Sequence, residues 1–193
     1  MKQLIIAVLF IAVATTYSCK KNKDDPAPNP NIIYESVNET LKTYTPKPAP
    51  TDRFEYIGSI SASVPKLAIG ILMSWETSPN GIYLHPNNSA GAILTNTHGL
   101  IKGMPAGVAI NSASISWNTS SPAISYDYVT NSTSSKGDFA GKGNLYIGFY
   151  TIDSDKKYYG WAQLNVSADG RTVKLIDYAV QKVPDTGIKT GEK

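Results

Sequence analysis

The sequence predicts an all-β fold, an antiparallel β-sandwich of about 8-10 strands with a jelly-roll-like form. After Asn31 no long stretch places apolar residues at helical spacing. Short runs of β-branched and aromatic residues instead alternate with Gly, Pro, Asn and Ser, which is typical of strands separated by turns. In the last third of the chain, apolar side chains recur at every second position, the period of a strand with two unlike faces.

Each expected strand is a run of this kind bounded by turn residues. The runs cover residues 32–41, 54–61, 67–75, 81–84, 91–94, 108–117, 123–129, 144–152, 158–166 and 172–180. The first run counts as a strand, although the Pro-rich residues 45–51 follow it, because Ile32, Tyr34 and Val37 need burial.

The last three runs predict the most specific arrangement. In residues 145–150 every second side chain is Leu, Ile or Phe, and those between are Tyr or Gly. Turn residues at 153–156 separate this run from the next, and Asp169-Gly170 separates that run from the last. We therefore expect a three-stranded antiparallel meander over residues 144–180.

Composition bounds the class of protein. The chain has 193 residues, 41% hydrophobic and 17% charged, with a net charge of +3. These values fit one domain with short additions, and they argue against charged disorder and against several membrane spans. Residues 51–193 hold 12 Lys and Arg against 11 Asp and Glu, a net of +1. Nucleic acid is therefore not an expected partner.

The N-terminus predicts export and lipid anchoring. Residues 4–13 are an apolar run too short to span a bilayer but typical of a signal peptide. The only cysteine, Cys19, follows Thr16-Tyr17-Ser18, a pattern similar to a bacterial lipoprotein signal in which the cysteine is acylated. We expect residues 1–18 to be the signal peptide. The alternative is an ordinary secretory signal cleaved elsewhere.

Residues 19–30 are predicted to be a lipid-anchored tether, and residues 31–193 a single β-sandwich domain. The tether is charged and then Pro-rich, with nothing to bury. Two or more acyl chains hold a protein stably at a membrane, so the expected location is the outer membrane, on its periplasmic or cell-surface side. The Lys- and Asp-rich residues 20–25 either resemble a signal for transfer to the cell surface or form a solvated spacer.

The meander also carries a family resemblance. Residues 144–150 (NLYIGFY), 158–167 (YYGWAQLNVS) and 175–179 (LIDYA) resemble a pattern in exported bacterial β-sandwich proteins that are often PEP-CTERM-sorted. The resemblance implies the sandwich fold and no assigned activity. Members often have an Asp-rich stretch after the first strand that could hold Ca²⁺, but here only Asp52 remains. We therefore expect no metal and no cofactor.

Enzymatic machinery is not expected from the residues. The two histidines, His85 and His98, have no accompanying Gly-x-Ser-x-Gly element. A hydrolase with a site near His98, in the Gly-rich loop 95–107, is the alternative. Asp153 and Asp155 supply too few oxygens for a calcium loop and are interpreted as turn residues.

Aromatic side chains are the remaining candidates for binding. A tyrosine-rich outer face built from positions between 126 and 159, including Tyr158 and Tyr159, would suit a glycan or a protein. Trp161 follows Gly160 and is interpreted as structural. The candidate ligand-binding residues are Trp75, Trp117, Tyr126, Tyr128, Tyr146 and Tyr150.

The sequence thus predicts a non-catalytic cell-envelope lipoprotein that serves as a binding or surface-structural module. Its expected partners are the membrane, through the lipid at Cys19, and a glycan or another envelope protein. A further hypothesis is that the protein is a structural component of the envelope whose edge strands pair with neighbouring molecules.

Overall fold

The computed structural model describes residues 27–41, 54–63, 65, 67–74, 81–86, 91–97, 100–119, 123–126, 137–168 and 172–193. These residues form twelve β-strands and no helix, which confirms the predicted all-β class. Nothing in this part of the chain is a helix long and apolar enough to cross a bilayer. The predicted signal peptide and Cys19 lie outside the described residues.

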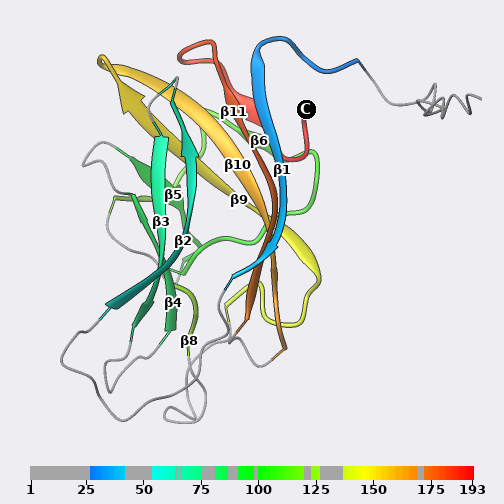
Figure 1. Cartoon of the computed structure of the whole chain (residues 1–193). Coiled ribbons are helices and arrows are strands. Elements are labelled where there is room, and N and C mark those ends of the chain that lie inside the picture. Colours follow the sequence, from blue (N-terminus) through cyan, green and yellow to red (C-terminus); the bar gives the residue numbers. More distant parts are fainter. Residues whose placement is uncertain are drawn as a thin grey trace, which may run out of the picture.

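Two antiparallel sheets pack face to face (Figure 1). The larger sheet has the order β1 (Ile32–Thr40), β11 (Val173–Gln181), β10 (Lys156–Val166), β9 (Asn144–Asp153), β5 (Ala92–Leu94) and β7 (Trp117–Asn118). The smaller sheet has the order β2 (Phe54–Ala62), β3 (Leu67–Ser74), β4 (Gly81–Pro86) and β8 (Ala123–Tyr126). A two-stranded ribbon pairs β12 (Ile188–Lys189) with β6 (Ala109–Ile110).

The predicted meander is confirmed. β9 and β10 pair from Asn144↔Asn165 to Asp153↔Lys156, and β10 pairs next with β11. Ser154 and Asp155 form the two-residue turn with φ of 51° and 61°, the left-handed values of a type I′ hairpin. Asp155 therefore lies in the turn as predicted, whereas Asp153 is the last residue of β9.

The first expected strand is also confirmed, since β1 covers Ile32–Thr40 and pairs antiparallel with β11. Its register shifts between Ser36 and Glu39, where Asn38 has a φ of 54°. Such a bulge twists an edge strand and limits its pairing with other chains.

The single strand expected over residues 108–117 is wrong. The structure has β6, then a turn, then β7. The backbone N–H of Asn111 donates to Ser114 Oγ (3.1 Å), and the N–H of Ser114 donates back to the Asn111 carbonyl (3.0 Å). Asn and Ser side chains offer the backbone local partners that compete with a sheet ladder. The short strand β12 was not predicted.

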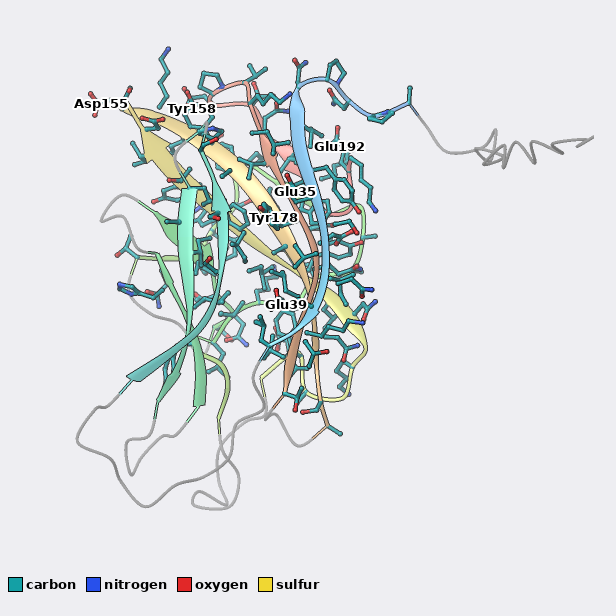
Figure 2. The ribbon with its side chains drawn as sticks, in the orientation of Figure 1. Glu35, Glu39, Asp155, Tyr158, Tyr178 and Glu192 are labelled. Atoms are coloured by element: carbon teal, nitrogen blue, oxygen red, sulfur yellow. The ribbon has the colours of Figure 1, made fainter. Side chains whose placement is uncertain are left out.

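The main core lies between the two sheets. Ile60, Leu67, Ile69 and Leu84 from the smaller sheet pack against Ile147, Phe149, Leu164 and Val180 from the larger one. Tyr178 of β11 crosses between the layers and donates its hydroxyl proton to the Ser61 carbonyl of β2 (2.6 Å). Figure 2 shows Tyr178 between β2 and β1, which carries Glu35 and Glu39.

A second core covers the opposite face of the larger sheet. Its buried members include Leu94, Met104, Ile110, Trp161 and Ile188. The segment around β6 and the C-terminal residues lie on this side, away from β2, β3 and β4 (Figure 1). Because both of its faces are covered, the inner strand β11, which lies next to the edge strand β1, is buried at almost every position.

Candidate functional site

The outer face of the larger sheet gathers most of the described aromatic side chains. Strand alternation places Tyr146 and Tyr150 of β9 on this face, and the register sets Tyr150 opposite Tyr159 of β10. Trp117 of β7 joins them because β7 pairs with β5, which pairs with β9. Trp161 lies beside them in the second core, as the sequence interpretation of a structural role expects.

The rings form two contacting groups. Trp117 and Tyr150 meet edge to face with centroids 4.7 Å apart and planes at 69°, and Tyr159 lies 6.3 Å from Tyr150. Tyr146 and Trp161 meet in the same manner at 5.2 Å and 81°. Edge-to-face contacts stabilise aromatic pairs beyond their burial alone, so these ring positions are fixed.

Each group has a buried member, Tyr159 in the first and Trp161 in the second, while Tyr146 is half-buried. Trp117 and Tyr150 are half-buried, and the Lys157 ammonium lies 4.9 Å from the centre of the Tyr150 ring. Trp161 is fully buried, and its indole N–H donates to the Glu192 carbonyl (3.2 Å). Figure 2 shows Glu192 on the side of the larger sheet away from the smaller one.

The C-terminal residues, which cover Trp161, are hydrogen-bonded to the rest of the fold. The buried Thr190 hydroxyl donates to the Pro105 carbonyl (2.7 Å) and accepts from the Val108 N–H (2.9 Å). The backbone N–H of Asn29 donates to the Lys193 carbonyl (2.9 Å), which joins the two ends of the described chain.

A polar cluster lies beneath the same segment. Asp177 is only 5% exposed, and its Oδ2 accepts the Tyr34 hydroxyl proton (3.0 Å) and lies 3.2 Å from Lys193 Nζ. Within the described part of the chain, its other oxygen is buried without a hydrogen-bond partner. Burying a carboxylate is costly unless it is paired, so Lys193 and Tyr34 act here as structural partners.

Burial and hydrogen bonding shift several pKa values upward around these two cores. Burial is the main cause that raises the pKa of Tyr146, Tyr159 and Tyr178 above the ordinary tyrosine value. The hydrogen bond to Tyr34 is the main cause that raises the pKa of Lys193. In all four cases the folded chain holds its proton more tightly than the unfolded chain does.

These shifts predict that the protein loses stability in alkali. The four groups contribute to the free energy of unfolding. This contribution is fully present below their pKa values in the unfolded chain, which are about 10 for tyrosine and about 10.4 for lysine. It is lost as the pH rises through the higher pKa values of the folded chain. The free energy of unfolding, measured by urea titration, should fall steadily above about pH 10. Tyr159→Phe removes one such group and should give a shallower decline. A stability that stays constant between pH 9 and pH 11 would contradict this expectation.

Residues 100–119 form a surface beside the accessible rings. A depression of about 310 Å³ is lined there by Leu94, Lys102, Met104, Val108, Ala109, Asn111, Ala113, Ser114 and Ile115. A smaller one of about 220 Å³ lies near β12 and shares Ala109 and Asn111 with it. Ile115 is 80% exposed, an unusual position for a large apolar side chain.

The structure brings together three of the six candidate ligand-binding residues, namely Trp117, Tyr146 and Tyr150. Trp75 and Tyr128 lie outside the described residues. Tyr126 belongs to β8 of the smaller sheet, so the candidates do not share one surface.

The expected tyrosine-rich outer face also needs correction. Tyr158 and Tyr159 are neighbours on β10, and their side chains point to opposite faces because side chains alternate along a strand. Tyr158 packs against the core between the sheets, and Tyr159 belongs to the outer cluster.

Sequence reasoning missed the pairing of Asp177 with Tyr34 and Lys193, and the exposure of Ile115. The alternation of β11 could have placed Asp177 on the face of Trp161. No sequence signal pointed to Lys193, since its position depends on the fold of the last turn.

The structure places only one of the two histidines. His98 lies outside the described residues, and His85 sits half-buried within β4. Among the described side chains, no three of the types His, Cys, Asp and Glu gather so that they could hold a metal ion.

Comparisons with protein-family models, with curated proteins and with solved structures find no match to this chain. The resemblance to PEP-CTERM-sorted β-sandwich proteins therefore stays a prediction based on the motifs in the meander.

Proposed function

We propose that this chain is a non-catalytic lipoprotein of the bacterial cell envelope that binds a glycan through Trp117 and Tyr150. The carrying observation is the geometry of these two half-buried rings, which meet at 4.7 Å and 69° on a sheet that is rigidly packed on both faces. Aromatic side chains offer large apolar contact area at low cost in conformational entropy.

The surroundings of the rings favour a preformed platform. The Trp117 indole N–H donates to the Ser114 carbonyl (2.8 Å), which fixes the indole plane before any ligand arrives. Lys157, beside the Tyr150 ring, adds a cation that a sugar hydroxyl or carboxylate could meet. Apolar rings flanked by a few polar groups are the usual lining of small-ligand sites.

Anchoring is supported by the sequence alone. Cys19 follows an export signal and precedes a Pro-rich tether, and the described chain begins eight residues later at Ala27. Acyl chains on Cys19 would hold the sandwich at the membrane. Incorporation of labelled fatty acid by the parent chain, and its loss in Cys19→Ser, is the expected result. An unmodified thiol on a freely secreted product would remove this part of the proposal.

The binding function predicts a selective effect of ring removal. The full chain in detergent should bind a subset of bacterial polysaccharides on a glycan array. Tyr150→Ala should weaken that binding by at least about tenfold, because it removes one of the two contacting rings. Far-ultraviolet circular dichroism would confirm that the variant folds.

Tyr158→Ala is the matched control, since it removes the same side chain from the same hairpin but from the inner face. It should leave glycan binding near the parental level once folding is confirmed. Equal losses in the two variants, or no glycan bound by the parent, would overturn the glycan proposal.

A further inference from the structure

We propose that the outer surface of residues 100–119 is a self-association surface, through which two copies of the chain pair about a two-fold axis. In this pairing Ile115 of each copy enters the depression of the other copy, which is about 310 Å³ in volume. The pairing surface adjoins the Trp117 ring, but it uses the Ile115 side chain and the depression, so the inference goes beyond the proposed glycan binding.

The charge of this segment is unusually low for a surface. Lys102 is the only charged residue among residues 100–119. Besides Lys102, the exposed positions of the segment are uncharged. They are Pro105, Ala106, Gly107, Ala109, Ser112, Ala113, Ile115, Ser116 and Thr119. Depletion of charge, rather than overall hydrophobicity, distinguishes the centres of protein interfaces from ordinary surface.

Ile115 is held outward by a rigid loop. The carbonyl of the next residue, Ser116, accepts both the backbone N–H and the hydroxyl of Thr95, each at 2.9 Å. Ser116 itself has a φ of +66°, a strained value for a residue with a side chain. Strain of this kind persists only where the surrounding structure enforces it, and it concentrates at functional surfaces. The exposed isoleucine is therefore a preorganised apolar knob.

The depression beside Ile115 is the matching hole. Leu94 and Met104 are almost fully buried and give it apolar lining, while Ala109 and Ala113 are small, exposed residues beside it. A knob next to a hole on one surface is self-complementary under two-fold rotation, which is the requirement of an isologous dimer.

The polar groups in the depression favour a second copy over a hydrophilic ligand. Asn111 and Ser114 are committed to their own turn, because Asn111 Oδ1 accepts the Ala113 N–H (2.9 Å) and Ser114 Oγ accepts the Asn111 N–H. Lys102 is then the one charge that each copy brings. Two surfaces so poor in charge meet with little repulsion and need few ion pairs.

The size of the surface predicts weak association. The ten exposed residues are fewer than the roughly 20–30 residues per partner of a standard stable interface. A dimer of this size should dissociate readily in dilute solution. Tethering to one membrane raises the effective concentration of both copies, and there the pairing would be populated.

The test compares two apolar-to-charged changes in the full chain in detergent micelles. Sedimentation velocity over a concentration series should show a monomer–dimer equilibrium for the parent. Ile115→Asp should weaken dimerisation by at least about tenfold, because it places a charge in an apolar contact. Val183→Asp is the matched control, since Val183 is the other exposed large apolar residue in the described part of the chain, at 40%, and does not line the depression. It should dimerise as the parent does.

A second measurement tests the knob and the hole together. Cells that co-express Ile115→Cys and Ala113→Cys chains should give an oxidised dimer that the parent, with Cys19 alone, does not give. A parent that stays monomeric at every concentration, together with no cross-link, would overturn the inference. Equal effects of Ile115→Asp and Val183→Asp would do the same. Glycan binding by the Ile115→Asp variant, measured in parallel, reports separately on the proposed function.

Discussion

Trp161→Ala is expected to lower the free energy of unfolding by about 3–5 kcal/mol, the usual cost of truncating a fully buried tryptophan. Trp161 has no exposed surface, and its ring contacts Tyr34 and Tyr146. Its indole N–H also donates to the Glu192 carbonyl. Truncation to alanine therefore leaves a cavity and removes a hydrogen bond to the C-terminal residues. The free energy of unfolding of a domain is commonly about 5–15 kcal/mol, so this loss would be a large fraction of it.

Two further variants separate the causes of that loss. Trp161→Phe keeps an aromatic ring but loses the hydrogen bond to Glu192, so it should cost clearly less than Trp161→Ala. Trp117→Ala truncates a half-buried ring of the same size and should cost about half as much or less. Urea unfolding followed by circular dichroism would measure all three. A Trp161→Ala loss no larger than that of Trp117→Ala would show that the full burial of Trp161 adds little stability.

The sequence was sufficient to predict the meander because the signals for it are local. Period-two alternation and a two-residue turn fix β9 and β10 without any knowledge of the rest of the fold. The pairing of β1 with β11 could not be predicted in the same way, since residues some 140 positions apart must meet.

Residues 108–117 show how the same reasoning fails. The β-branched residues Val108, Ile110 and Ile115 suggested one strand, yet Asn111 and Ser114 close a turn between β6 and β7. The local hydrogen bonds of the Asn and Ser side chains outweighed the apolar pattern. This turn is what exposes Ile115, so the surface most suited to contact arises where the pattern breaks.

The candidate site was predictable in part for the same physical reason. Tyr146 and Tyr150 share a face because they are four positions apart on one strand, and alternation alone requires it. Trp117 joins them only through the sheet order β9-β5-β7, which no local signal gives. The cluster of Asp177, Tyr34 and Lys193 needs both the sheet order and the path of the last residues.

Gly160→Ala is expected to destabilise the fold by about 3 kcal/mol, at the upper end of the usual cost of overpacking a core. A Cβ at this position would overlap the ring of Phe149 and would lie 2.7 Å from the carbonyl oxygen of Ala179. Neither obstacle can move easily, because Phe149 is fully buried between the sheets and Ala179 is backbone within β11. The glycine is therefore required by close approach, although alanine is ordinarily the better residue in a strand.

Gly148→Ala is the matched control, one strand away on β9. There the nearest atoms are the methyl ends of Leu94 (2.6 Å), Ile110 (3.1 Å) and Met104 (3.1 Å), which can rotate aside. Gly148→Ala should cost about 1 kcal/mol. Phe149→Leu should recover part of the Gly160→Ala loss in a double-mutant cycle, with a coupling of about 1 kcal/mol or more, because the smaller side chain frees the space that the new Cβ needs. Additive effects in that cycle would mean that the Ala179 carbonyl, and not the Phe149 ring, excludes a side chain at residue 160.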